Sequence, residues 1–334
     1  GPGPADTWCR RARGLAAKSR QCLNSGNYRK EGTHGMTTST AAPATGLGRL
    51  SAPPFVGIFA FIAVLAIVPL MHSALGVIMD VFPDHYDTPV SIGIGALAIA
   101  LMIAGSLSRS EAVGTWFGFI AAHLVWTGWI ELSFRFNPEF MGMGPLVVNG
   151  EHVLSASLLF VEATVGLLMA TLPFFVFNRD TRCNAFMWIQ RVCRYDAGKP
   201  APASERNFAR ITFLEVLYVV WFCYAVSLFL VDSRFLGLHH PVTYVATFLL
   251  TIWTFYLLLR LGRFTRILAA VRYAVPTAGV MWVSIEITQE WGLFTEFWTQ
   301  PTEYVLEMSI LIGAFVVALL LAVVMPRRRT TGKA

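Results

Sequence analysis

The sequence predicts an all-α integral membrane protein with eight transmembrane helices, built as two tandem four-helix repeats in parallel orientation. Three observations support this prediction: the composition, eight long apolar segments, and a similarity between the two halves of the chain. Of the 334 residues, 55% are hydrophobic and only 14% are charged, against about 25% charged residues in ordinary soluble domains. A chain with so few charges and such long apolar blocks is typical of membrane proteins.

The eight apolar segments are each close to the length that a membrane-spanning helix requires. Crossing the hydrocarbon core takes about 20 apolar residues at 1.5 Å per residue. The segments lie at 54–79, 90–107, 113–134, 152–177, 211–231, 241–259, 267–288 and 304–325.

The distribution of charge predicts the orientation of these helices. With the segments placed alternately, 24 of the 26 Lys and Arg residues fall on one side of the membrane, and only Arg135 and Arg234 fall on the other. Basic loops remain in the cytoplasm during insertion. We therefore expect a multi-pass protein of the cell inner (plasma) membrane with both termini in the cytoplasm. The net charge of +6 records this topology and gives no indication of nucleic-acid binding.

The same reasoning divides the chain into five regions. A basic tail at 1–53, rich in Gly, Ala, Ser and Thr, is expected to be disordered. Its residues 1–35 are expected to be an over-extended start rather than native chain, because Met36 opens a stretch that reads as a natural short tail. The first repeat then spans 54–177, a basic cytoplasmic linker spans 178–210, the second repeat spans 211–325, and a basic tail occupies 326–334.

The internal repeat emerges when the chain is shifted against itself by 152 residues. Asp80 then aligns with Asp232, and Pro89 aligns with Pro241. The nine residues from Glu151 align with those from Glu303 with five identities, whereas Glu131 and Glu286 match at an offset of 155. Because each half holds an even number of helices, the halves are expected to insert in the same direction, related by a pseudo-two-fold axis along the membrane normal.

Small residues are expected to let helices approach closely inside the first half. They are Gly93, Gly95, Gly114, Gly118, Ala121 and Ala122.

Ionisable residues within membrane segments are costly and therefore mark functional candidates. In the third segment, His123, Thr127 and Glu131 fall on one helical stripe, and Trp282, Glu286 and Glu290 form a comparable stripe in the seventh. If the halves are related as predicted, both stripes meet near the outer face. The candidates for substrate binding or proton relay are His123, Glu131, Glu162, Glu286 and Glu290. The candidates for metal binding are His72, His123, Glu131, His152 and Glu286, whose donor atoms suit Zn, Fe or Cu.

Three functional hypotheses remain open from the residues alone. The first is a small-solute or ion transporter with a polar site between the repeats, favoured by prolines inside three helices at Pro69, Pro173 and Pro276. The second is a membrane-embedded metal enzyme or redox protein, whose outer-face site the aromatic segments 131–151 and 290–298 would cover. The third is an accessory or assembly subunit without a site of its own.

Several chemistries can be excluded. The motifs HExxH, GxSxG and CxxC and the phosphate-binding glycine loop are all absent. Besides the lipid bilayer, the expected partners are other membrane proteins or further copies of this chain.

Overall fold

The computed structural model describes residues 52–81, 87–148, 151–181, 184–198, 202 and 205–324. These residues all belong to one compact unit, Thr45–Ala334. The predicted tails at 1–53 and 326–334, apart from residues 52 and 53, lie outside the described residues, as does the expectation for residues 1–35.

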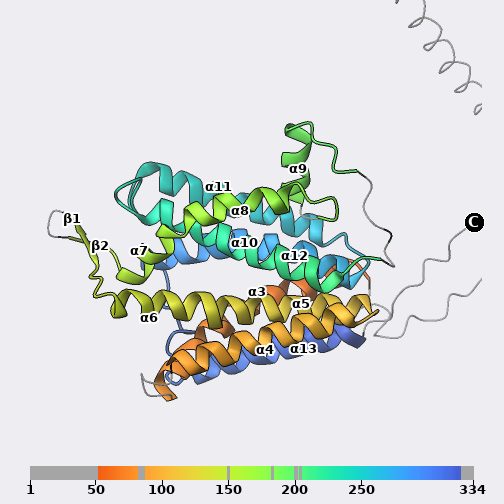
Figure 1. Ribbon diagram of the computed structural model, residues 1–334, viewed down its shortest axis with the longest axis horizontal. Helices are drawn as coiled ribbons and strands as arrows, with labels where there is room; N and C mark the ends of the chain where they lie inside the picture. Colours follow the sequence, from red (N-terminus) through yellow and green to blue (C-terminus); the bar gives the residue numbers. More distant parts are fainter. Residues whose placement is uncertain are drawn as a thin grey trace, which may run out of the picture. The chain divides into compact units, whose positions relative to one another are not determined.

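The described chain is mostly helical (Figure 1). In chain order the elements are α3 (Phe55–Val81), α4 (Asp87–Leu107), α5 (Glu111–Val125), the π-helical segment η2 (Trp126–Glu131), α6 (Leu132–Phe140), β1 (Leu146–Val148), β2 (Glu151–Leu154), α7 (Ala156–Ala163), α8 (Val165–Val176), α9 (Asn184–Val192), α10 (Phe208–Val231), α11 (Pro241–Leu261), α12 (Ile267–Glu290) and α13 (Val305–Val324).

The apolar helices confirm a multi-pass, helical membrane protein with six or seven candidate spans in the described chain. Six helices are long and apolar enough by themselves. The segment predicted at 152–177 forms α7 and α8, which meet at a 42° bend and together make a seventh span if they cross as one unit. The segment predicted at 304–325 forms α13, whose apolar stretch Val305–Leu321 is shorter than a full span. The predicted count of eight is therefore supported only in part.

Two local features depart from the sequence prediction. The third helix does not end near residue 134 but continues through η2 and α6 to Phe140. The chain then forms the antiparallel hairpin β1–β2, in which Val147 pairs with His152, so a small sheet is present in a fold predicted to be all-α. We call the end of the bundle that carries this hairpin the hairpin end (Figure 1).

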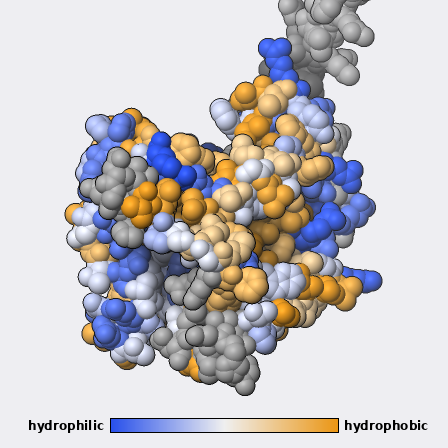
Figure 2. All heavy atoms as spheres, turned by 60° about the vertical axis from the view of Figure 1, so that its left-hand side comes forward, coloured by the Kyte–Doolittle hydropathy of each residue, from blue (hydrophilic) through white to orange (hydrophobic). Residues whose placement is uncertain are grey.

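Four helices form the centre of the bundle. Helix α3 packs against α12, α10 packs against both α5 and α12, and each of these four helices also carries an outer neighbour. The outer pairs are α4 on α5, α11 on α12, α13 on α3 and α8 on α10. Large apolar side chains are exposed along the outer helices α11 and α13, for example Phe248, Phe255 and Ile310, as expected for helices that face lipid. Figure 2 shows one face of the molecule, on which hydrophobic and hydrophilic side chains both reach the surface.

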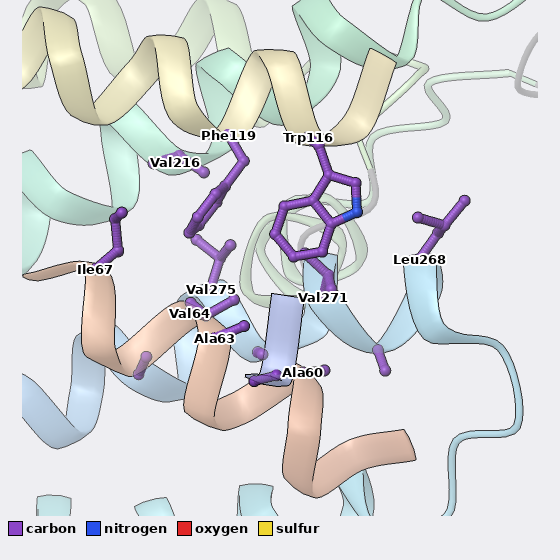
Figure 3. Packing of buried hydrophobic residues seen from close by; sticks show 14 of the residues in the cluster. Ala60, Ala63, Val64, Ile67, Trp116, Phe119, Val216, Leu268, Val271 and Val275 are labelled. Atoms are coloured by element: carbon purple, nitrogen blue, oxygen red, sulfur yellow. The ribbon is translucent and has the colours of Figure 1, made fainter. Parts of the chain in front are cut away.

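The largest apolar core fills the centre of the bundle away from the hairpin end. Figure 3 shows Phe119 from α5 pointing toward Val275 of α12 and Val64 of α3. Phe119 and Val271 are completely buried, and Val64 is only 3% exposed. Lipid tails are as apolar as these side chains, so the core is stabilised mainly by close packing and not by removal from water.

The predicted small residues do not all act as expected. A Cβ atom on Gly118 would lie 2.3 Å from the carbonyl oxygen of Ala209, so this glycine permits contact between α5 and α10 rather than contact within the first half. Gly114 likewise faces Ala209, whereas Gly95 of α4 lies against Trp129 of η2. Gly93 has no neighbour within 4 Å of an added Cβ, so its predicted role in packing is wrong.

Replacing Gly118 with alanine is expected to destabilise the protein by about 1–3 kcal/mol, because the added methyl group forces the backbones of α5 and α10 apart. Thermal unfolding of the purified protein in detergent measures this loss. Gly93→Ala is the matched control, since it adds the same methyl group to a helix facing open space, and it should leave stability unchanged or slightly higher. Equal unfolding temperatures for the two variants would contradict the observed packing.

Candidate functional site

A cavity of about 980 Å³ opens at the hairpin end of the bundle. Its walls come from α3, η2, α6, α7, α10, α12 and the connection between α12 and α13. It therefore lies between helices of the first predicted repeat and helices of the second. Its acidic and histidine lining residues are His72, Glu131, Glu286, Glu290 and Glu296.

A histidine–glutamate pair joins α3 to η2 at the cavity wall. The Nδ1 atom of His72 lies 3.3 Å from a carboxylate oxygen of Glu131, and both side chains are largely buried. The His72 ring also stacks on Trp282 of α12, with ring centroids 5.9 Å apart and planes only 14° from parallel. His72 thus contacts one residue from each half of the chain.

Glu286 is held in place by two hydrogen bonds. The indole Nε1 of Trp282 donates to one carboxylate oxygen at 2.7 Å, and the Ser227 hydroxyl of α10 donates to the other at 3.0 Å. Two donors satisfy much of the acceptor capacity of a carboxylate, which offsets the cost of placing it away from bulk water. The helical spacing of Trp282 and Glu286 was visible in the sequence, but the contribution of Ser227 from α10 was not.

The connection between α12 and α13 closes over this tryptophan. Trp298 packs against Trp282 with ring centroids 5.2 Å apart, and it is only 5% exposed. The hydroxyl of Ser73, the residue next to His72, donates to the carbonyl oxygen of Trp298 at 2.7 Å. These contacts fix the connection, which carries Glu296, against α3.

The π-helical segment brings Glu131 to the cavity. A π turn holds more residues than an α turn, so it rotates the side chains that follow, and such turns often lie at functional sites. Two close contacts to α4 accompany the segment: the Ser91 hydroxyl donates to the carbonyl of Gly128, and a Cβ on Gly128 would lie 2.6 Å from Ile94. The hydropathy of the sequence does not predict that the helix adopts π turns here.

A smaller cavity of about 50 Å³ extends inward from the same wall. It shares His72, Glu131, Tyr224, Trp282 and Glu286 with the large cavity, and His123 and Thr127 line its deeper part. The Nδ1 atom of His123 lies 2.9 Å from the carbonyl oxygen of Phe119, so Nδ1 carries the proton in the neutral ring and Nε2 is the remaining acceptor. The Thr127 hydroxyl is buried and has no hydrogen-bond partner among the described residues.

Glu162, predicted as a midplane candidate, lies elsewhere. It pairs with Arg234 in the connection between α10 and α11, and Arg234 also binds Asp232 at 2.7 Å. Hydrogen bonding to Asp232 raises the pKa of Arg234 above its ordinary value, with Glu162 adding to the effect. Glu162 therefore ties α7 to the second half of the chain and does not line the cavity.

The predicted metal ligands are only partly brought together. His72, Glu131 and Glu286 share the cavity, and His123 lies beneath it. In the described part of the chain, no three His, Cys, Asp or Glu side chains are grouped closely enough to hold one ion. The side chain of His152 lies outside the described residues.

Tyr224 and Ser227 are lining residues that sequence reasoning missed. The sequence held one indication of Tyr224: the 152-residue shift that aligns Asp80 with Asp232 also aligns Tyr224 with His72.

Comparison with known proteins found no match for this chain: no family model, no curated protein and no solved structure matches it.

Glu296 gives the cavity a measurable pH dependence. Partial burial raises the pKa of its carboxyl group, the neighbouring carboxylate Glu290 raises it further, and His72 opposes the shift. Because the folded pKa lies above the unfolded one, the folded protein loses stability as the pH rises through the interval between them. Glu296→Gln removes this loss, so the variant should gain unfolding temperature relative to the parent at pH 7 but not at pH 4.

Thermal unfolding at the two pH values measures that difference. Glu303→Gln removes a carboxylate from the same connection at an exposed position, and it should give the same small effect at both. If Glu296→Gln behaves like Glu303→Gln, Glu296 is not desolvated in the cavity.

Proposed function

We propose that this protein is a transporter for a small solute or ion, with its substrate site in the cavity between two structurally related halves. The observation that carries the proposal is the cavity itself: it is large, carries four carboxylates and is open at one end of the bundle, and a packed apolar core lies toward the other end. A site near the middle of a duplicated bundle, open to one side at a time, is the arrangement that alternating access requires.

The packing of the helices supports the relation between halves. Helices α3 and α10 begin at Phe55 and Phe208, 153 positions apart, close to the offset found in the sequence. Under that offset, the contact of α3 with α12 corresponds to the contact of α10 with α5, and α4 on α5 corresponds to α11 on α12. The contact of α13 with α3 corresponds in the same way to that of α8 with α10. Each half therefore packs its first helix against the third helix of the other half.

An ion-pair cluster supports closure at the end opposite the hairpin. Arg272 of α12 donates to Glu111 of α5 at 2.9 Å and to the Thr115 hydroxyl at 2.9 Å, and Arg266 reaches the same carboxylate at 3.3 Å. The Arg272 guanidinium also lies over the ring of Phe208 at the start of α10. These contacts join the two halves across the closed end, and an inward-open state would have to break them.

Loss of this cluster should shift the protein away from its outward-open state. A cysteine is introduced by Ser227→Cys into a variant otherwise free of cysteine. Its rate of reaction with a membrane-impermeant maleimide added from the outer side measures how accessible the cavity is from that side. Adding Arg272→Ala should slow that labelling several-fold in proteoliposomes, because the closed end then opens more readily and the outer mouth closes.

Arg263→Ala is the matched control, since it removes the same charge from an exposed position before α12. It should leave the labelling rate unchanged. If the variant with Arg272→Ala is labelled as fast as the variant without it, the cavity does not change its opening. That result is expected for an enzyme or an accessory subunit, and it rejects the transport mechanism.

We further propose that the hairpin end faces outward and that both termini are cytoplasmic. The support is the asymmetry of Lys and Arg between the two faces. A reporter enzyme fused after Asp84 should be active only outside the cytoplasm, and one fused after Asp196 only inside it. The reverse pattern would invert every assignment of faces and make the cavity inward-open.

A further inference from the structure

We propose that the cavity binds a small organic cation with an apolar body, its ammonium group held between Glu131 and Glu286. This substrate class deepens the proposed transport function and rests on it. The inference comes from the division of the cavity into an acidic wall and an apolar wall, and from a small recess beneath the acidic wall that contains an unpaired hydroxyl group.

The acidic wall selects for positive charge. Four of its side chains are carboxylates, His72 lies beside them, and no Lys or Arg is present among the described lining residues. The carboxylates come from η2, α12 and the connection after α12. Such a concentration of one sign in a cleft with low-dielectric walls attracts cations and repels anions.

A second wall of the cavity is formed by an apolar cluster. Phe134 of α6, Val161 of α7 and Leu228 of α10 pack together as one cluster, with Leu158 against it, and all four line the cavity. Such a surface offers no ligand to an inorganic ion but suits an alkyl or aromatic body. The two walls together therefore match an amphipathic ligand with one cationic end.

The size of the cavity also favours an organic ligand. A volume of about 980 Å³ lies at the upper end of the range of pockets that hold drug-sized molecules, roughly 300–1,000 Å³. A single metal ion would need several ligands at about 2–2.5 Å from one point, and no group of three His, Cys, Asp or Glu side chains provides this in the described chain.

The recess beneath the acidic wall is a second, independent observation. Its Thr127 hydroxyl is 2% exposed and lacks a hydrogen-bond partner among the described residues, although an unpaired buried hydroxyl is costly. Glu131 and Glu286 line the same recess from opposite halves of the chain. An ammonium group placed there meets a carboxylate from each half and has a hydroxyl oxygen, that of Thr127, as a further acceptor.

Binding to the purified protein in lipid nanodiscs tests the proposal. Phenethylamine is the probe, and its binding is measured by calorimetry. We expect affinity to rise at least several-fold from methylamine to phenethylamine, and the neutral isostere 2-phenylethanol to bind at least ten-fold more weakly than phenethylamine. Equal binding of the alcohol, no binding of either amine, or tighter binding of Zn²⁺ than of phenethylamine would each overturn the proposal.

Variants assign the two walls separately. Glu286→Gln should weaken phenethylamine binding about ten-fold or more, whereas Glu303→Gln, outside the cavity, should not. Leu228→Ala should weaken phenethylamine binding but leave methylamine binding unchanged, a length dependence that general damage to the fold does not produce. Unchanged phenethylamine affinity in both Glu286→Gln and Leu228→Ala would place the ligand elsewhere.

Uptake of labelled phenethylamine into proteoliposomes separates this inference from the function on which it rests. Binding without uptake in either direction rejects transport and leaves the ligand class intact. Uptake of another solute without any amine binding rejects the ligand class and leaves transport intact.

Discussion

The cost of placing carboxylates inside a membrane is the constraint on which the rest of this structure depends. Glu131 and Glu286 lie on helices that cross the bilayer, where an ionisable group without partners is strongly unfavourable. Contacts between the two halves of the chain offset this unfavourable free energy. Glu131 of the first half pairs with His72, whose ring stacks on Trp282 of the second half, and Trp282 donates to Glu286. The cavity, the cross-packed helices and the covering connection after α12 all surround this short chain of contacts.

The two ends of the bundle are held together by different groups, and this difference gives the cavity its direction. At the hairpin end, the ion pairs of Arg234 with Glu162 and Asp232 tie α7 to the connection after α10, beside an open cavity. At the other end, Arg272 and Glu111 join α12 to α5 above a closely packed apolar core. A rocking motion of one half against the other would exchange which end is closed, while the contacts around His72 remain near its centre.

The sequence predicted the helices well and the site in part. Hydropathy located every long helix of the described chain, because a long continuous apolar segment indicates a helix surrounded by lipid. The spacing of Trp282, Glu286 and Glu290 placed them on one stripe, and all three line the cavity. Glu162 shows the limit of such reasoning: its depth was visible, but its partner Arg234 is 72 residues away, and only the packed structure brings them together. The π turn at Trp126–Glu131 and the hairpin were likewise absent from the pattern: close contacts with α4 accompany the π turn, and the hairpin strands are only three and four residues long.

The central claim, that the cavity changes its opening between two related halves, is tested most directly by measuring a distance across its mouth. Ser157 on α7 and Thr299 after α12 both line the cavity, one from each half of the chain, and pulsed electron resonance between spin labels at these positions in nanodiscs measures their distance distribution. The account predicts two populations, with the shorter distance becoming dominant when the Arg272–Glu111 pair is removed. A single population that is the same with and without this pair would contradict the account.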